Sequence, residues 1–214
     1  MKPLFCLVAV FASMAQATLI FDNTAALTSG SDPVAPPSTG YFGPLYDSFT
    51  TGAGGGVLAD LKVLLSGSAT SSGSFDIALY ADSSTNPGTK LADFGTLFDS
   101  ALTSSPTLYD IATGDPTLAP DTRYWIGLTG NATTAFWAWS TDTTGPGVEH
   151  EFFANSDGVF ANDPNGPYQM SVVINPEPAT LLLLPLGALL LVTTRFGRQI
   201  PDSKARQTRF PPAP

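Results

Sequence analysis

The chain contains one histidine, and this limits the chemistry that its side chains can perform. His150 lies between two acids, Glu149 and Glu151. The apolar spacing predicts a strand over residues 148–153, in which the two glutamates share one face and His150 points to the other. The three side chains then cannot converge on one metal ion. A Ser-His-Asp triad would also depend on this histidine alone, so we expect a strand histidine with no catalytic or metal-binding role.

Paired carboxylates are the second chemistry to consider, because glycoside hydrolysis needs two acids that face each other. The acids are numerous, but many lie in turn sequences such as 113–116 and 156–158, where aspartate bonds to the local backbone. No pair stands out by its spacing. The sequence therefore predicts no catalytic residues and no enzyme, and a carboxylate-dependent glycoside hydrolase is the less favoured alternative.

Metal binding has equally little support. Cys6 is the only cysteine and lies in the apolar N-terminal stretch, so the rest of the chain has no disulfide, thiol catalyst or zinc–thiolate site. The segment 162–166 hints at a calcium loop. Placing Gly166 at the sixth position of an EF-hand puts Ala161 first and Val172 twelfth, where oxygen ligands are required. We expect a turn there, no cofactor, and at most a structural calcium with no assigned ligands.

Two tryptophans offer a binding chemistry instead. Trp137 and Trp139 are two residues apart and share one face of a strand, with Phe136 and Ala138 on the other. If Phe136 faces the core, both tryptophans point outward and form a flat platform for a glycan. Otherwise they belong to the core, where aromatic side chains usually pack. Core packing is the favoured interpretation, and the glycan platform is the alternative.

Short apolar runs separated by Gly, Ser, Thr, Pro, Asn and Asp predict many strands joined by turns. The odd positions of 57–65 are apolar, and Phe75, Ile77 and Leu79 repeat this alternation. The stretch 28–43 is expected to be a loop or an extended edge. Further strands are expected at residues 92–98, 106–112, 122–129, 134–140, 148–153 and 168–174. Eight to ten short strands indicate an all-β fold, an antiparallel β-sandwich of the jelly-roll type.

The net charge of this β-rich body limits the classes of partner that it can be expected to bind. Residues 18–174 carry three basic side chains and sixteen acidic ones, a net charge of −13. Nucleic acids and anionic membrane surfaces attract positive charge, so neither is an expected partner. The length fits one domain with a sizeable core. We expect a soluble domain outside the cell.

The N-terminus has the three parts of a secretory signal. Lys2 supplies the positive charge, residues 4–12 the apolar run, and Ala15 and Ala17 the small residues at positions −3 and −1 of a cleavage site. The apolar run is shorter than the roughly 20 residues that cross a bilayer. We expect the secretion translocase to export the chain and signal peptidase to cut after Ala17, which leaves Thr18 as the first residue.

The C-terminus combines a proline-rich break, an apolar segment and a basic tail. The uncharged stretch 179–194 is rich in leucine, and Arg195 and Arg198 follow it. As a helix it would reach about 24 Å, and snorkelling of the arginines would cover the remainder of a hydrocarbon core of roughly 30 Å. Basic residues after the segment favour a cytoplasmic C-terminus. We therefore expect a C-terminal transmembrane helix.

This segment resembles the PEP-CTERM sorting signal of Gram-negative bacteria. The similarity lies in Pro176, Glu177 and Pro178, the leucine-rich helix and the basic residues, and covers about the last fifth of the chain. The family usually ends in a tight arginine cluster, whereas here the basic residues are spread to Arg209. The resemblance implies recognition and removal by an exosortase-type membrane protease, and an exopolysaccharide-producing, biofilm-forming bacterium. A C-terminal anchor that is never cleaved is the alternative.

A second resemblance covers residues 45–140. Together its pieces are similar to the exported domains called choice-of-anchor R, which occur with alternative C-terminal anchors. The family has no established activity, so the resemblance implies an extracellular module and supplies no active-site residues. The pieces are Asp47–Gly52, Leu61–Leu65, Leu79–Asp82, Asn86–Gly88, Leu91–Ala92 and Leu118–Trp125.

These observations predict three regions: a signal peptide at 1–17, an extracellular domain at 18–174 and a sorting segment at 175–214. The expected protein is exported, anchored transiently in the inner membrane, then sorted to the cell envelope, cell surface or extracellular matrix. Its domain is predicted to be a non-catalytic structural or interaction module with exopolysaccharide as a partner. A carbohydrate-binding module is the alternative function.

Overall fold

The computed structural model describes residues 16–37, 43–162 and 166–176, and residues 15–177 form one compact unit. The predicted signal helix and the predicted transmembrane helix lie outside these ranges. Within the described ranges, no helix has the length and apolar character needed to cross a membrane. The structure therefore concerns the body of the chain, between its two apolar ends.

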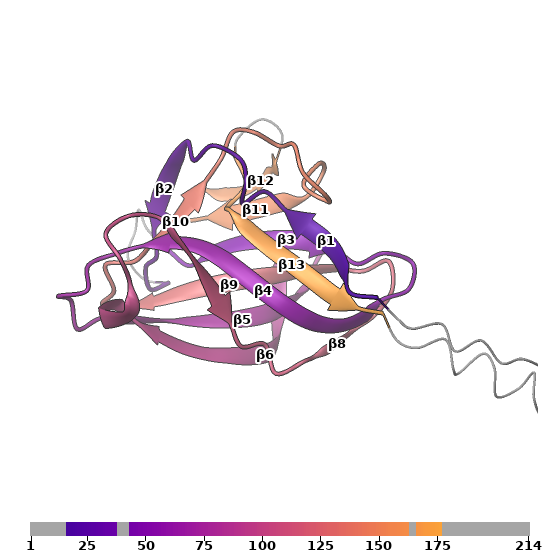
Figure 1. The fold of residues 1–214 in the computed structure, drawn as a ribbon, viewed down its shortest axis with the longest axis horizontal. Coiled ribbons are helices and arrows are strands. Elements are labelled where there is room, and N and C mark those ends of the chain that lie inside the picture. The colour runs from indigo at the N-terminus through magenta and orange to yellow at the C-terminus, as the bar shows by residue number, and fades with distance from the viewer. Residues whose placement is uncertain (1–15, 38–42, 163–165, 177–214) are drawn as a thin grey trace, which may run out of the picture. The chain divides into compact units, whose positions relative to one another are not determined.

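Two antiparallel sheets make up this body (Figure 1). The first has the order β1-β13-β4-β10-β2, with β7 and β8 also paired to β4, and the second has the order β12-β11-β3-β9-β5-β6. The prediction of an all-β antiparallel fold is confirmed. The first sheet contains β1 (Thr18–Asp22), β2 (Gly30–Pro33), β4 (Gly56–Ser66), β7 (Thr107–Ile111), β8 (Thr117–Leu118), β10 (Phe136–Trp139) and β13 (Met170–Asn175). The second contains β3 (Leu45–Thr50), β5 (Ser74–Asp82), β6 (Pro87–Phe98), β9 (Arg123–Asn131), β11 (Phe152–Asn155) and β12 (Gly158–Ala161), and a 3-10 turn, η1 (Asp99–Ala101), follows β6.

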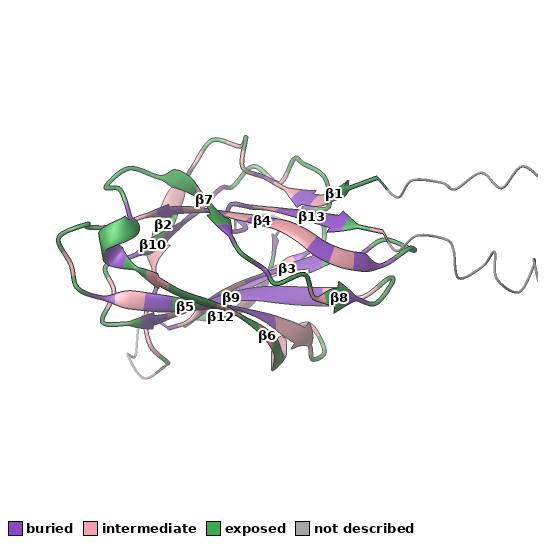
Figure 2. Ribbon diagram, turned by 60° about the horizontal axis from the view of Figure 1, so that its bottom comes forward, coloured by how far each residue is buried: buried purple, intermediate pink, exposed green. Residues whose placement is uncertain are grey.

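The two sheets lie in two layers (Figure 2). Buried side chains from both sheets form one hydrophobic core. Leu61, Val63 and Leu65 enter this core from β4, and Phe75 and Ile77 enter from β5. These inward positions alternate with partly or fully exposed ones, because successive side chains of a strand point to opposite faces. Removing the apolar faces from water is the main force that holds the layers together.

One part of the predicted alternation is wrong, and a β-bulge explains it. Leu58 is fully buried, whereas Val57 and Ala59 are only partly buried. The pairing of β13 with β4 shifts at this point, from Asp60 to Leu58. An extra residue in one strand reverses the faces of the residues beyond it. The odd positions therefore face inward from Leu61 onward but not before.

The predicted strand at 148–153 is also wrong in its first half. Strand β11 begins at Phe152, and residues 146–150 form turns. His150 and Gly147 have φ angles of 69° and 68°, a left-handed conformation that a strand cannot contain. A Cβ at Gly147 would lie 1.9 Å from the carbonyl oxygen of Ile20. The chain passes too close to β1 there for any residue but glycine.

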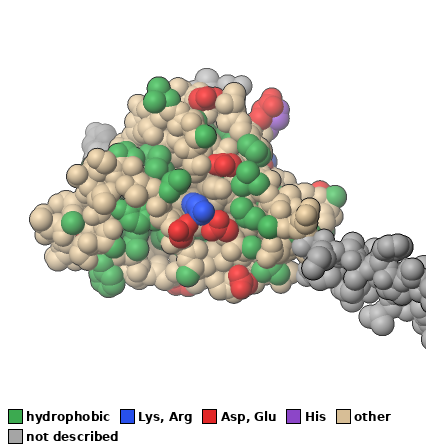
Figure 3. Space-filling model, in the orientation of Figure 1, with side chains coloured by type: hydrophobic (Ala, Val, Ile, Leu, Met, Phe, Trp, Pro, Cys, Tyr) green, Lys and Arg blue, Asp and Glu red, His purple; other side chains and the backbone are tan. Residues whose placement is uncertain are grey.

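The surface of the body carries the acidic excess that the composition predicts. The face in Figure 3 shows acidic side chains spread over it and basic atoms in one place beside them. Lys62 on β4 lies 3.4 Å from Asp60 and 3.5 Å from Asp110 on β7. Because all three side chains are at least a third exposed, these pairs contribute little to stability.

Candidate functional site

His150, the one histidine, lies on the surface. Its side chain is 84% exposed, and its Nε2 lies 3.3 Å from Glu149 Oε1. The expectation that Glu149 and Glu151 share a face opposite His150 is wrong, because the segment turns: the side chain of Glu151 is 7% exposed, whereas that of Glu149 is 75% exposed. Nothing in the described surroundings of His150 provides the partners of a nucleophile or of a metal.

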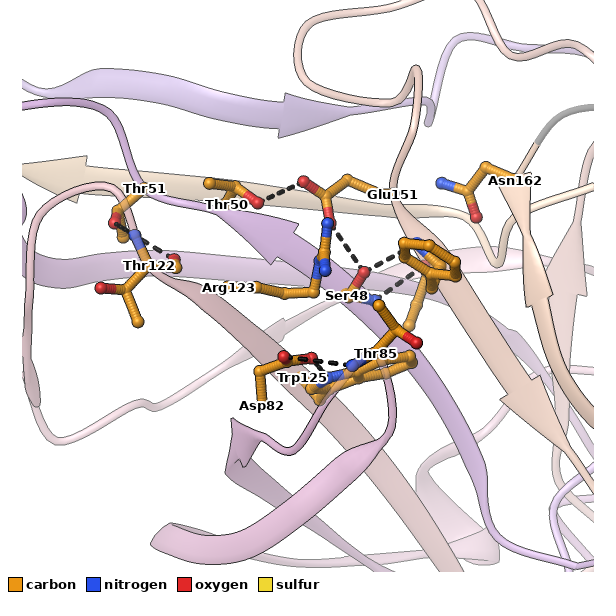
Figure 4. A network of polar contacts seen from close by, with 12 residues as sticks. Ser48, Thr50, Thr51, Asp82, Thr85, Thr122, Arg123, Trp125, Glu151 and Asn162 are labelled. Atoms are coloured by element: carbon orange, nitrogen blue, oxygen red, sulfur yellow. Dashed lines mark hydrogen bonds and ion pairs between the residues drawn. The ribbon is translucent and has the colours of Figure 1, made fainter.

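Glu151 is the centre of a cluster of polar contacts on the outer side of the second sheet (Figure 4). Its Oε2 accepts hydrogen bonds from Ser48 Oγ at 2.8 Å and from Arg123 Nε at 3.0 Å, and its Oε1 accepts one from the Thr50 hydroxyl. The guanidinium of Arg123 also lies 4.7 Å from the ring of Phe152. Both oxygens of Glu151 are thus bonded to protein donors. The cluster joins β3 and β9 to the segment that enters β11.

Asp47 faces the opposite way, into the core. It is fully buried, and its Oδ1 accepts a hydrogen bond from the Ser48 backbone N–H at 2.9 Å. In the part of the chain that the structure describes, its Oδ2 has no partner. Burial raises the pKa of Asp47 well above its ordinary value, and the charge of Glu151 raises it further. Asp47 is therefore a neutral acid at pH values where surface aspartates are ionised.

The segment that hinted at calcium does not gather acidic ligands in its described part. Asn162 is buried, its Nδ2 donates to the Val148 carbonyl at 3.0 Å, and its Oδ1 has no partner among the described residues. The Gly166 N–H donates to the Asn162 carbonyl at 3.4 Å. Residues 163–165 lie outside the described ranges. Within those ranges no three His, Cys, Asp or Glu side chains come together as metal ligands.

A hollow of about 270 Å³ is lined by residues of β2, at the edge of the first sheet, and of β12, at the edge of the second. We call this region of the domain the open edge. This volume is close to the lower end of the range for small-molecule sites, about 300 Å³. A smaller hollow of about 70 Å³ adjoins it and shares Asp32 and Asn155. The larger hollow is lined by Asp32 of β2, Trp139 of β10, Phe153 and Asn155 of β11, Phe160 of β12, and Gly166.

Tyr168 forms the inner support of this hollow. Its hydroxyl donates to Asp32 Oδ2 at 2.6 Å, and its ring stacks on Trp137 with centroids 4.7 Å apart. The ring also meets Phe153 edge to face at 5.8 Å, and Phe153 stacks on Phe160 at 5.3 Å. Burial raises the pKa of Tyr168 well above its ordinary value, so the hydroxyl keeps its proton. This aromatic chain joins the two sheets behind the hollow.

The two tryptophans of β10 have different environments, so the platform of two outward-facing tryptophans is wrong. Trp137 is fully buried, and its Nε1 donates to the Gln169 carbonyl at 3.1 Å. Phe136, 39% exposed, is the side chain that points outward. Trp137 is a core residue, as the favoured interpretation of the sequence predicted, and its ring packs against that of Tyr168.

Trp139, in contrast, is partly exposed and lines the hollow. It lies across Gly30 on β2, where a Cβ would come within 2.3 Å of its Cζ2. A Cβ at Gly166 would come within 2.9 Å of its Cε3. Larger residues at either glycine would displace the indole. The two glycines therefore leave the space that the Trp139 indole occupies at the open edge.

Sequence reasoning found Trp139 but missed Asp32, Asn155 and Phe160. Asn155 and Phe160 lie on the neighbouring strands β11 and β12, but Asp32 on β2 is more than a hundred positions away, and only the fold brings it beside them. A single local motif cannot reveal such a group.

The residues predicted to guide processing lie at the borders of the described body. Ala17 directly precedes β1, and Pro176 directly follows β13. Ala15, Glu177 and Pro178 lie outside the described residues. The predicted processing sites thus flank the described strands at both ends.

No protein-family model, no curated protein and no solved structure matches this chain. The fold class of the chain therefore follows from its own structure, a domain of two antiparallel sheets. A small hollow lined by aromatic and polar side chains lies at the open edge of this domain.

Proposed function

We propose that the chain is an exported β-sandwich protein that an exosortase-type protease sorts to the cell surface or extracellular matrix. Its body acts there as a non-catalytic structural or interaction module. The signal-like N-terminus, the Pro176-Glu177-Pro178 motif and the apolar segment after it support export and sorting. The jelly-roll character of the body, its signal helix and its C-terminal transmembrane helix belong to this proposal.

One observation carries it: the strands fill the interval between the two proposed cleavage sites and do not cross either. Strand β1 begins at Thr18, directly after Ala17, and β13 ends at Asn175, directly before Pro176. Thr18 lies opposite Ile174 in the pairing of β1 with β13. Cutting the chain at either site therefore removes none of the described strands.

A non-catalytic role accords with the environment of the reactive side chains. His150 is a surface residue, Glu151 is bonded to three protein donors, and Asp47 is buried away from solvent. General acid–base catalysis needs a titrating group within hydrogen-bond reach of a substrate. None of these three side chains lines the hollow at the open edge.

Intact-mass spectrometry of the protein from its native host tests the proposal. A chain that starts at Thr18 and ends near Pro178 is the expected result, and a chain that ends at Pro214 would contradict sorting. The control is a variant with Pro176, Glu177 and Pro178 all changed to Ala. It should keep its C-terminal segment and stay in the membrane fraction while still losing its first 17 residues.

A further inference from the structure

We propose that the hollow at the open edge binds one ring of a neutral saccharide. Trp139 supplies the stacking face, and Asp32 and Asn155 supply the polar contacts. This inference rests on the proposed function, since it names the partner that an extracellular interaction module would meet in a polysaccharide matrix. The site differs from the surface platform expected from Trp137 and Trp139, because Trp137 takes no part in it.

The lining of the hollow fits the surface of a sugar ring. A pyranose has apolar C–H groups on its faces and hydroxyl groups around its rim, so it needs a flat apolar surface beside hydrogen-bonding groups. Trp139 and Phe160 provide partly exposed aromatic surface, and Asp32 and Asn155 are partly exposed beside them. A carboxylate accepts hydrogen bonds from hydroxyls, and an amide both donates and accepts them. Few polar groups within an aromatic lining are typical of small-ligand sites.

The site is fixed before any ligand arrives. Trp139 packs against the core beside Gly30 and Gly166, which leave room for its indole, and the Tyr168 hydroxyl donates a hydrogen bond to one oxygen of Asp32. Asn155 Oδ1 accepts the Asp157 backbone N–H at 2.9 Å, which sets its side chain. Side chains that are already ordered lose little entropy on binding, and this favours measurable affinity from a small contact.

Charge and size define the class of saccharide. Asp32 lies in the hollow and Asp157 lines the adjoining one. With the acidic excess of the body, they repel uronates and sulfated sugars. A volume of about 270 Å³ admits a single ring. The expected ligand is therefore one neutral hexose unit of a longer chain, bound at the protein edge while the rest of the chain extends into solvent.

The three indole N–H groups allow a direct test by NMR. Trp137 Nε1 and Trp125 Nε1 donate to protein oxygens, those of Gln169 and Asp82, away from the hollow. The full chain, in a detergent without a sugar headgroup, is titrated with short neutral oligosaccharides of glucose, galactose and mannose. A saturable shift confined to the Trp139 indole is expected at about 10 mM, which exceeds a Kd of about 1 mM.

Matched variants show whether the hollow is responsible. Trp139→Ala should weaken binding at least about tenfold, which corresponds to about 1.4 kcal/mol. Trp139→Phe keeps the strand packed and should weaken it less. The control is Phe136→Ala, on the same strand but pointing outward, which should bind as the unchanged protein does. The amide spectrum of each variant reports whether it is folded, and the shifts of the amides that line the hollow report its binding, because both Trp139 variants lack the indole.

Two results would overturn the proposal. One is the absence of a saturable Trp139 shift with every saccharide of the panel, or a shift given by benzyl alcohol but by no saccharide. The other is binding that a folded Trp139→Ala or Trp139→Phe variant retains in full. Mass spectrometry of the two chain ends is independent of these titrations, so a failure of saccharide binding would leave the export proposal standing.

Discussion

At the scale of single residues, Asp47 links burial to a measurable dependence of stability on pH. Its folded-state pKa is raised by burial above the unfolded value of about 3.9. Above pH 4 the unfolded chain releases this proton while the folded domain keeps it. The folded state then binds more protons, so this residue's contribution to the free energy of unfolding falls as pH rises. The fall continues until the pH reaches the folded-state pKa.

Asp47→Asn should remove this dependence, because the amide cannot titrate. In urea unfolding, the stability of the unchanged protein relative to the variant should decrease with pH, by up to about 1.4 kcal/mol per pH unit within that window. Asp110→Asn, a change at an 80% exposed side chain, is the control. A constant difference between Asp47→Asn and the unchanged protein from pH 4 to pH 8 would show that Asp47 is ionised in the core.

What the sequence predicts at this scale depends on whether a residue's environment is local. The alternation of Phe75, Ile77 and Leu79 is local, and all three are buried as predicted. Asp47 has no local signal, because an aspartate on an inner strand face looks in the sequence like any turn aspartate. Asp32 is similar, since its partner Tyr168 is 136 positions away.

At the scale of elements, the Glu151 cluster ties β3 and β9 to the segment that enters β11. Glu151→Ala removes the acceptor of two hydroxyls and leaves Arg123, whose side chain is 24% exposed, without its carboxylate. Because Arg123 keeps some contact with water, the expected loss is about 2–4 kcal/mol, below that of a fully buried pair. Urea unfolding measures this loss of stability.

The matched control is Glu149→Ala, two residues earlier, where the side chain is 75% exposed. It should change the free energy of unfolding by less than about 0.5 kcal/mol. Equal effects of the two changes would mean that the cluster contributes nothing beyond a surface charge. A double-mutant cycle with Arg123→Ala then isolates the energy of the ion pair.

Elements with regular alternation are predicted well, and those with irregular backbone are not. Strand β4 was found within a residue at each end, whereas its bulge at Ala59 was missed, because one extra residue leaves no mark on composition. The sequence predicts a strand around His150 because the apolar residues Val148 and Phe152 flank it, whereas the structure has a turn there. Short β2 was expected only as part of a loop or an extended edge.

At the scale of the whole molecule, the two ends of the body lie side by side. Thr18 is opposite Ile174, and neighbouring strands are about 4.8 Å apart. A linker of about four glycine and serine residues should therefore join Asn175 to Thr18. Opening the exposed loop between Ala69 and Thr70 should then give a circular permutant that unfolds within about 10 °C of residues 18–176. Thermal unfolding followed by circular dichroism measures this.

The contrasting permutant is opened inside β4, between Leu61 and Lys62. It should fail to fold, because β4 pairs with β13, β10, β7 and β8. If both permutants fold equally well, β4 is not the strand on which the first sheet depends.

The all-β class was predictable at this scale from turns and short apolar runs. The strand order was not, because it depends on pairings far apart in the sequence.

The place of β13 in the first sheet bears on how this body reaches its folded state. The last described strand, β13, lies between β1 and β4, so among the described strands β1 has no pairing partner until β13 is present. Pairings between such distant segments form slowly, and a chain threaded through a translocase emerges N-terminus first. In the proposed export route, the first sheet could therefore not be completed until residues 170–175 have crossed the membrane. The edge of β4 that pairs with β13 would need protection until then.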